Sequence, residues 1–361
     1  MKVTIITCFS YAGNSKYHFN PDYLRSDLRR ILAFSQNRTG VRLQDTYVLT
    51  DIQPSLSVIE EYLSEFHEET YAVLIEKGYP SRRVARAFDN ARKHRCKPLI
   101  WLQAVCKELD PSTSHLSKSI ERSLLSIIRT QNVIEFAYLF TNFFMVFGAN
   151  QFEGTLSRIL TERYSKLLFY YTGHGIRSIN GISLLIPRGS EVDFLSNVKL
   201  QEVFRAVALR DRLSAFIILD CCHAQSLLPL PEYKTLSRSE SDRNQSEIDF
   251  INEIVTVSST RDHQTCGFLS EKGATGSIFS YFLMKHLNSI AQEVERGHED
   301  LRLSRLRNGV EKRVTEYRNR MGKPPQNAAL GLNDSRIRCL PRWLFEESYK
   351  RSEQRVINHS G

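Results

Sequence analysis

Two short stretches constrain the fold of this 361-residue chain more than any other part of it. Each is a run of apolar residues that ends in reactive side chains: Leu167-Leu-Phe-Tyr-Tyr-Thr-Gly-His-Gly175 and Phe216-Ile-Ile-Leu-Asp-Cys-Cys-His-Ala-Gln225. Uninterrupted apolar runs are typical of strands that are buried in a parallel sheet. Ligands of open α/β sheets gather at the carboxyl ends of the strands. The two runs therefore predict neighbouring strands that bring a histidine and a cysteine to one edge of a sheet.

The rest of the chain alternates between strand and helix patterns. Besides the two runs, strands are predicted at 2–9, 45–51, 133–147 and 253–258, and a turn followed by a strand at 178–187. Helices are predicted at 21–34, 55–77, 82–95, 97–108, 116–130, 150–164, 200–209, 278–287 and 301–320. This alternation indicates an α/β fold with a mostly parallel central sheet flanked by helices.

Composition excludes several classes of protein. Hydrophobic residues make up 41% of the chain and charged residues 25%, as in ordinary globular proteins. The net charge of +9 is spread along the chain without a Lys/Arg block, which indicates solvated surface. Nucleic-acid binding through the basic helices at 82–95 and 301–320 is a weaker alternative. The most apolar stretch, 133–148, contains polar residues and is too short to span a bilayer.

The cysteines indicate a reducing environment. There are seven, an odd number, and their scattered spacing does not fit a disulfide scaffold. The first ten residues form an apolar strand pattern without the features of a signal peptide. We therefore expect a soluble, intracellular protein, located in the cytoplasm or another reducing compartment.

His174 and Cys222 are the candidate catalytic pair. A nearby histidine can deprotonate a cysteine and later protonate the leaving amine of a peptide bond. The separation of 48 positions between the two matches the histidine-before-cysteine order and spacing of caspases. The backbone amides of Gly175 and Cys222 are candidate donors to an oxyanion.

Two other interpretations apply to the same residues. Cys222 could be a small buried hydrophobic residue and His174 a histidine of the core, since free cysteines are commonly buried. Zinc is not expected, because the consecutive residues Cys221, Cys222 and His223 cannot all face one ion.

The motifs resemble those of metacaspases and other caspase-like cysteine peptidases. Tyr171-Thr-Gly-His-Gly175 is similar to their Y-S-G-H-G, and Asp220-Cys-Cys-His-Ala224 to their D-S-C-H-S. Weaker similarities follow at Val257-Ser-Ser-Thr-Arg-Asp-His-Gln264, Gly276-Ser-Ile-Phe-Ser280 and Pro325-Gln-Asn327. The resemblance implies a caspase-like sandwich with His174 as base and Cys222, rather than Cys221, as nucleophile.

The resemblance also implies a substrate class. Metacaspases accept Arg or Lys before the scissile bond in an acidic pocket, and the corresponding residues here are Asp27, Thr172 and Asp220. Paired carboxylates are suited to binding a guanidinium. Alternatively, Asp27 caps or solvates the helix at 21–34, and Asp220 orients the turn that follows its strand. No membrane partner is expected.

Three segments depart from the family or extend it. The stretch 176–189 lacks the acidic residues that metacaspases use for calcium activation; only Glu191 and Asp193 follow, so a calcium requirement is not indicated. Residues 52–148 match nothing in the family and are interpreted as a helical insertion of unassigned role within a single peptidase domain, 1–361. The polar loop 229–249 offers Lys234, Arg238 and Arg243 as candidate self-processing positions, with an ordinary surface loop as the equal alternative.

The sequence thus predicts a cysteine endopeptidase that cleaves proteins after Arg or Lys through a His–Cys dyad and a covalent acyl-enzyme. The alternative is a catalytically weak or inactive caspase-like scaffold that acts by binding partners through 52–148.

Overall fold

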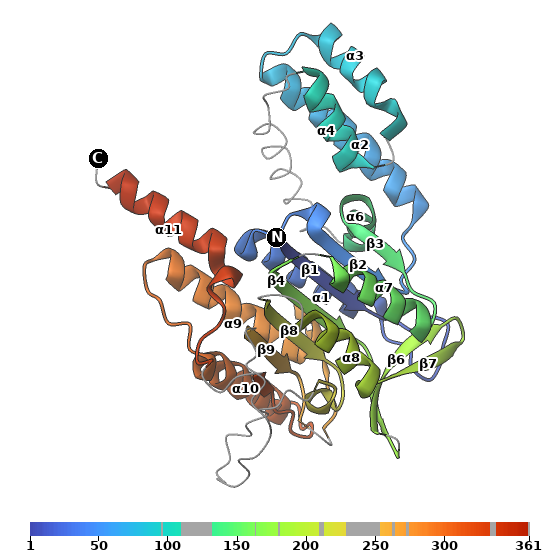
Figure 1. Cartoon of the computed structure of the whole chain (residues 1–361), viewed down its shortest axis with the longest axis vertical. Coiled ribbons are helices and arrows are strands. Elements are labelled where there is room, and N and C mark those ends of the chain that lie inside the picture. Colours follow the sequence, from blue (N-terminus) through green and yellow to red (C-terminus); the bar gives the residue numbers. More distant parts are fainter. Residues whose placement is uncertain are drawn as a thin grey trace. The chain divides into compact units, whose positions relative to one another are not determined.

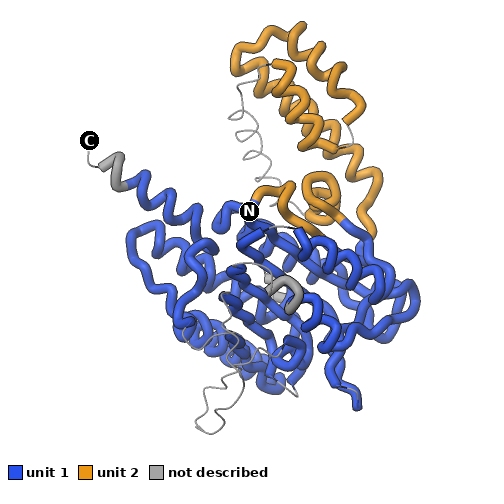
Figure 2. The backbone as a smooth tube through the Cα atoms, in the orientation of Figure 1, with its two compact units in different colours: residues 1–41, 49–52, 144–361 blue, residues 42–48, 53–143 orange. Residues whose placement is uncertain are grey.

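The computed structural model describes residues 1–94, 97–109, 132–162, 164–179, 181–208, 213–228, 253–261, 264–271, 274–332 and 337–359. These residues form two compact units (Figure 2). Unit 1 comprises 1–41, 49–52 and 144–361, and unit 2 comprises 42–48 and 53–143. The boundary between them runs through β2 (Thr46–Thr50) and β3 (Asn142–Met145).

Unit 1 is built on a seven-stranded sheet with the order β12-β9-β8-β4-β1-β2-β3 (Figure 1). Its remaining strands are β1 (Lys2–Cys8), β4 (Lys166–Thr172), β8 (Ser214–Asp220), β9 (Glu253–Ser258) and β12 (Ala329–Leu332). The pairs β1–β4, β4–β8 and β8–β9 are parallel, and β12 is antiparallel to β9. The predicted α/β fold with a mostly parallel central sheet is confirmed.

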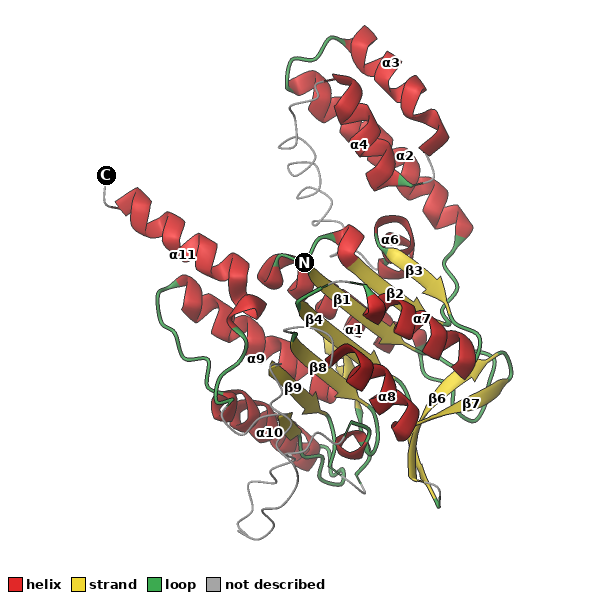
Figure 3. Cartoon of the chain, viewed as in Figure 1, coloured by secondary structure: helices red, strands yellow, loops and turns green. Residues whose placement is uncertain are grey.

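Helices cover both faces of this sheet. On its faces lie α1 (Pro21–Phe34), α7 (Ala149–Thr161), α8 (Asn197–Ala208) and α9 (Ile278–Glu295), while α10 (Leu303–Arg320) and α11 (Glu346–His359) pack against α9. Figure 3 shows α7 and α8 on one face, with α1 and α9 on the other. The continuous apolar character of β8 follows from this arrangement, because side chains on both faces of the strand are buried.

Two small antiparallel elements complete unit 1. One is a three-stranded sheet of β5 (Gly175–Ser178), β6 (Gly181–Arg188) and β7 (Glu191–Ser196), and the other is the hairpin of β10 (Phe268–Glu271) and β11 (Ala274–Ser277). The β5–β6–β7 sheet begins directly after His174, so it continues the chain from the carboxyl end of β4.

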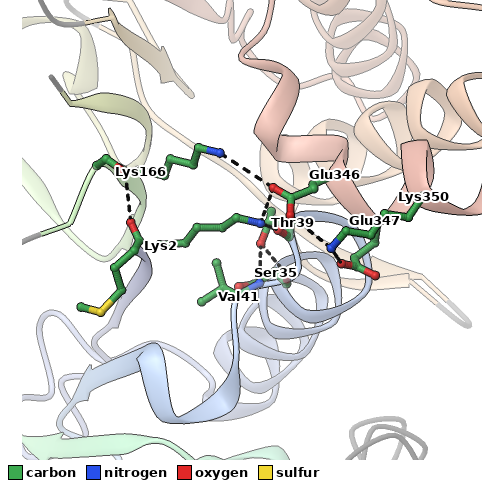
Figure 4. Close-up of polar contacts among 10 residues, drawn as sticks. Lys2, Ser35, Thr39, Val41, Lys166, Glu346, Glu347 and Lys350 are labelled. Atoms are coloured by element: carbon green, nitrogen blue, oxygen red, sulfur yellow. Dashed lines mark hydrogen bonds and ion pairs between the residues drawn. The ribbon is translucent and has the colours of Figure 1, made fainter. Parts of the chain in front are cut away.

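Ion pairs attach α11 to the amino ends of the central strands. Glu346 Oε2 lies 2.6 Å from Lys2 Nζ of β1 and 3.8 Å from Lys166 Nζ of β4 (Figure 4). The same Lys2 ammonium donates to the carbonyl oxygen of Thr39 at 2.6 Å. These contacts lie at the amino ends of β1 and β4, opposite to the strand ends that carry the candidate site residues.

Unit 2 contains the helices α2 (Leu56–Glu76), α3 (Ser81–Ala91), α4 (Pro98–Leu109) and α6 (Val133–Phe140). Aromatic side chains form its core: Phe66 contacts Trp101 at a centroid distance of 5.8 Å, and Phe88 contacts Trp101 at 4.6 Å. The predicted helix 116–130 lies outside the described residues. None of the described helices is both long and apolar enough to cross a membrane.

The predicted strand 133–147 is wrong over its first half. Residues 133–140 form α6, and a strand occupies only Asn142–Met145. Seven of the eight α6 residues are buried, so the segment is apolar all round and lacks the one-sided pattern that identifies a surface helix. A short apolar run of this kind fits a buried strand equally well by periodicity alone.

Candidate active site

The two predicted segments end at the same edge of the central sheet. In the β4–β8 ladder Thr172 pairs with Asp220, so His174 and Cys222 each follow two residues beyond the last matched pair. The backbones meet closely: a Cβ added to Gly175 would lie 2.1 Å from the carbonyl oxygen of Cys222. Position 175 therefore requires glycine, because any larger residue would clash there with the backbone of Cys222.

The ring of His174 is held by the loop that follows β1. Its Nε2 lies 2.8 Å from the carbonyl oxygen of Tyr17, and the ring stacks on Phe19 at a centroid distance of 4.1 Å. A carbonyl oxygen only accepts, so Nε2 carries the proton and Nδ1 presents the lone pair in the neutral ring. Burial lowers the pKa of His174, and the Tyr17 carbonyl acts in the opposite direction. The arrangement favours a neutral imidazole with Nδ1 as its basic nitrogen.

A tyrosine hydroxyl bridges His174 and Leu185, which lie opposite each other just before the first pair of the β5–β6 ladder. The His174 amide donates to Tyr11 Oη at 2.9 Å, and Tyr11 Oη donates to the Leu185 carbonyl oxygen at 2.8 Å. The Leu185 amide donates to the His174 carbonyl oxygen at 3.0 Å. Since hydrogen-bonded and non-hydrogen-bonded pairs alternate, the next pair, Gly175 with Leu184, directs its amides away from the partner strand. The Gly175 amide is thus turned away from β6.

The adjacent cysteines have different surroundings. Cys221 is buried, and burial raises its pKa well above the ordinary value. Cys222 is partly exposed, and hydrogen bonding from the Cys266 thiol and amide lowers its pKa to about 7, against the effect of burial. The distances from Cys222 Sγ are 3.6 Å to Cys266 Sγ and 3.4 Å to the Cys266 amide. Of the two candidates, only Cys222 combines access with thiolate character.

The turn that carries Cys222 is fixed from the segment after β9. His223 adopts a left-handed conformation (φ 56°), which is uncommon for residues other than glycine. The hydroxyls of Ser259 and Thr260 donate to the Cys221 carbonyl oxygen at 3.0 and 2.9 Å, and Thr260 Oγ1 accepts from the Ala224 amide at 3.1 Å. The predicted 257–264 segment therefore supports this turn, although 262–263 lie outside the described residues.

Asp27 is buried in α1 and already has partners. Its Oδ1 lies 2.7 Å from Arg30 Nη1, and its Oδ2 accepts from the Ser277 amide at 2.9 Å. Burial raises the pKa of this carboxyl to about 8, while Arg30 lowers it and the nearby Asp220 raises it further. Ser277, which donates to Asp27, and Ser280, which donates to Asp220, both lie at the start of α9, so the fold brings these two predicted residues to the same helix end.

Asp220 and Thr172 are also buried, side by side on paired strands. Ser280 Oγ donates to Asp220 Oδ2 at 2.5 Å and lies 2.9 Å from Tyr170 Oη. Burial raises the pKa of Asp220, and hydrogen bonds from Ser277, Ser280 and Ser259 oppose that rise. Asp220 thus lies beneath the first turn of α9, which the G-S-I-F-S motif begins.

One of the two carboxylates that follow the G-H-G motif is engaged within the protein. Asp193 accepts from the Ala149 amide at 3.0 Å and pairs with Arg188 at 3.3 Å. One carboxylate engaged in this way, with the exposed Glu191 beside it, is a poor match to the several oxygen ligands that calcium needs. The candidate processing residues Lys234, Arg238 and Arg243 lie outside the described residues.

Sequence reasoning missed Cys266, Arg30 and the aromatic residues around His174. Tyr17 acts through its backbone carbonyl, so its side chain carried no signal. The pair Asp27–Arg30, separated by three residues in a helix, was a visible ion-pair pattern.

Comparison with known proteins identifies the family. The family model described as "Caspase domain" matches residues 148–331, which is just over half of the chain. This range includes His174 and Cys222. Similar solved structures include a Geobacter sulfurreducens protein (12% identity, TM-score 0.31, 58% of this chain and 83% of that one) and pro-sf-caspase-1 (14%, 0.31, 56% and 75%). No curated protein matches. With its cysteine-peptidase-like α/β fold, the chain belongs to the caspase domain family.

Proposed function

We propose that the protein is a cysteine endopeptidase in which Cys222 is the nucleophile and His174 the base. The observation that carries the proposal is the contrast between the two adjacent thiols: Cys222 is partly exposed with a pKa of about 7, and Cys221 is buried with a raised pKa. A thiolate near neutral pH, beside a strand that ends in a histidine, is the arrangement that acyl transfer requires.

The reaction follows from the roles of these atoms. The Cys222 thiolate attacks the carbonyl carbon of the scissile bond, and the amides of Gly175 and Cys222 stabilise the resulting oxyanion. His174 Nδ1, which receives the thiol proton, delivers it to the leaving amine. Water, deprotonated by the same nitrogen, then hydrolyses the thioester. The Tyr17 carbonyl fixes the Nε2–H tautomer throughout.

We propose further that the site prefers Arg or Lys before the scissile bond, with Asp27, Asp220 and Thr172 forming the acidic base of the pocket. Their mutual proximity and burial support this assignment. Arg30 already pairs with Asp27, and the pKa of about 8 means that this carboxyl is only partly ionised near neutral pH, so a substrate guanidinium competes with an internal one and gains most when Asp27 is ionised. We therefore expect selectivity from charge, at an affinity reduced by that competition.

The rate at which iodoacetamide alkylates Cys222 should rise with pH about a midpoint near 7. A thiol with an ordinary pKa would give a midpoint near 8.5, because only the thiolate reacts. Cys266→Ala should move the midpoint upward, since hydrogen bonding from Cys266 is the main cause of the lowered pKa. Mass spectrometry of the labelled peptide measures the rate. A midpoint of 8.5 or above in the unchanged protein would remove the main support for catalysis.

Fluorogenic peptides that end in Arg, Lys or Asp test the specificity. We expect cleavage of the Arg and Lys peptides, and a loss of about 10- to 100-fold in kcat/KM for Asp27→Asn, the range expected for hydrogen bonds to a charged group. Asp22→Asn, an exposed position in the same helix, is the matched control.

Because Asp27→Asn leaves Arg30 facing a neutral side chain, the double variant D27N/R30M provides a second measurement without an unpaired buried charge. It should show the same loss of Arg and Lys cleavage while remaining folded. A preference for the Asp peptide, or unchanged kinetics in both variants, contradicts the pocket assignment.

Self-processing at Lys234, Arg238 or Arg243 is part of the same proposal, because these residues carry the side chains that the pocket would accept. A partner-binding scaffold is the second candidate function. It is favoured by the Asp27–Arg30 pair, which already balances the charge of the pocket. The alkylation experiment separates the two functions, since a scaffold has no need of a hyper-reactive cysteine.

A further inference from the structure

A second thiol lies against the candidate nucleophile. Cys222 follows β8 and Cys266 precedes β10, yet their sulfur atoms are 3.6 Å apart. Both side chains are partly exposed and both are free thiols. A disulfide bond is about 2.05 Å long, so an approach of about 1.5 Å would join them.

The two sulfur atoms differ in protonation. The pKa of Cys222 is lowered to about 7, whereas that of Cys266 is raised well above its ordinary value by the hydrogen bond to Cys222 and by burial. The pair therefore holds one thiolate and one thiol that donates to it. The largely buried guanidinium of Arg318 adds positive charge, and it fits there because Gly267 has no Cβ: that atom would lie 2.3 Å from Arg318 Nη1.

We infer that Cys222 and Cys266 form a redox pair, in which a hydroperoxide converts the two thiols into an intramolecular disulfide that reversibly blocks the nucleophile. The blocking effect rests on the proposed peptidase function; the formation of the disulfide does not. An accessible thiolate of low pKa beside a second cysteine is the arrangement of redox-sensing proteins.

The chemistry balances in two steps. The Cys222 thiolate attacks one oxygen of hydrogen peroxide, the O–O bond breaks, and a sulfenic acid forms while the departing hydroxide takes up a proton to become water. The Cys266 sulfur then attacks the Cys222 sulfur, the S–O bond breaks, and the hydroxide leaves as a second water with the Cys266 proton. Two thiols are oxidised to a disulfide, and one peroxide is reduced to two waters.

Cys221 is not a competing partner. It is buried, and its pKa is raised well above the ordinary value. Its sulfur packs against the backbone of Gly175, 3.2 Å from where a Cβ of that residue would lie. Cys222 therefore has its reactive neighbour in Cys266, across the turn and not along the chain.

The test is disulfide mapping. The protein is treated with equimolar hydrogen peroxide, remaining thiols are alkylated, and tryptic peptides are analysed without reduction. We expect the peptide 213–234 cross-linked to 262–272, with fragmentation placing the bond at Cys222, and a loss of at least tenfold in kcat/KM that dithiothreitol restores. Cys339→Ser, which removes an exposed cysteine elsewhere, should leave the cross-link unchanged.

Cys266→Ser should abolish the cross-link, and peroxide should then drive Cys222 to the sulfinic acid, which dithiothreitol does not reduce. The inference is overturned if oxidised wild-type protein carries no 222–266 cross-link, or if Cys222 is instead joined to Cys221. The cross-link is read without substrate. If the cross-link forms in a protein that cleaves no peptide, the peptidase proposal fails and the redox pair stands. If peroxide abolishes cleavage without forming the cross-link, the redox pair fails and the peptidase proposal stands.

Discussion

Replacing Cys222 by alanine should abolish cleavage of Arg- and Lys-ended peptides, with a loss on the order of 10⁴-fold or more in kcat/KM. No other accessible sulfur occupies the same turn, and removing a nucleophile removes the covalent route entirely. The substitution deletes only a partly exposed sulfur atom, so the thermal unfolding temperature should change little. Fluorogenic peptide kinetics with thermal unfolding measured alongside is the required experiment.

Cys221→Ala is the matched control, because it deletes the same atom from the preceding residue. Its thiol is buried and protonated, and the hydrogen bonds from Ser259 and Thr260 go to its backbone carbonyl, which alanine retains. This variant should keep most of the activity. If instead Cys221→Ala is inactive and Cys222→Ala is active, the nucleophile has been assigned to the wrong cysteine.

Gly175→Ala should reduce kcat/KM by about 100-fold, the loss that a displacement of about 1 Å produces in an active site. The new Cβ would lie 2.1 Å from the Cys222 carbonyl oxygen and 3.2 Å from its carbonyl carbon. Both are backbone atoms, so no side-chain rotation relieves the clash. The chain after His174 must move away from the turn that carries Cys222, which separates base from nucleophile and moves the Gly175 amide.

Gly154→Ala provides the comparison. Gly154 lies inside α7, and nothing lies within 4 Å of where its Cβ would be. That substitution should leave kinetics unchanged and raise the free energy of unfolding by about 0.5–1 kcal/mol, because alanine favours helix more than glycine does. If Gly175→Ala had wild-type kinetics, the close contact between the backbones at 175 and 222 would tolerate an added Cβ, and the prediction would be wrong.

The outline of the fold and of the candidate site could be predicted because both depend on strong local sequence patterns. The apolar runs before His174 and Cys222 are typical of buried strands, and parallel strands that end together bring their following residues together. The start of α1 also follows a known local pattern, because Pro is common at the first position of a helix and Pro21 begins this one. Asn20 caps the helix, and its side chain accepts a hydrogen bond from the Asp22 amide at 2.9 Å.

What the sequence could not predict depends on distant contacts. Cys266 is a single cysteine in a segment without regular pattern, and only tertiary folding places it 3.6 Å from Cys222. The Tyr17 carbonyl that fixes the histidine tautomer belongs to the backbone, which every residue shares. The choice between helix and strand at 133–140 was equally non-local, because burial on all sides erases the periodicity on which such a choice relies.

The loop after β1 has a consequence for control of the site. Tyr11, Tyr17 and Phe19 hold the amide, the Nε2 atom and the ring face of His174, and all three belong to the segment 11–19. The histidine therefore cannot keep its position if this segment shifts. In an equilibrium between this position of the segment and another, the fraction of molecules with a competent base would be the fraction with the segment in place. Each change of about 1.4 kcal/mol in that local equilibrium alters the ratio of competent to incompetent molecules tenfold, without any change in the dyad itself.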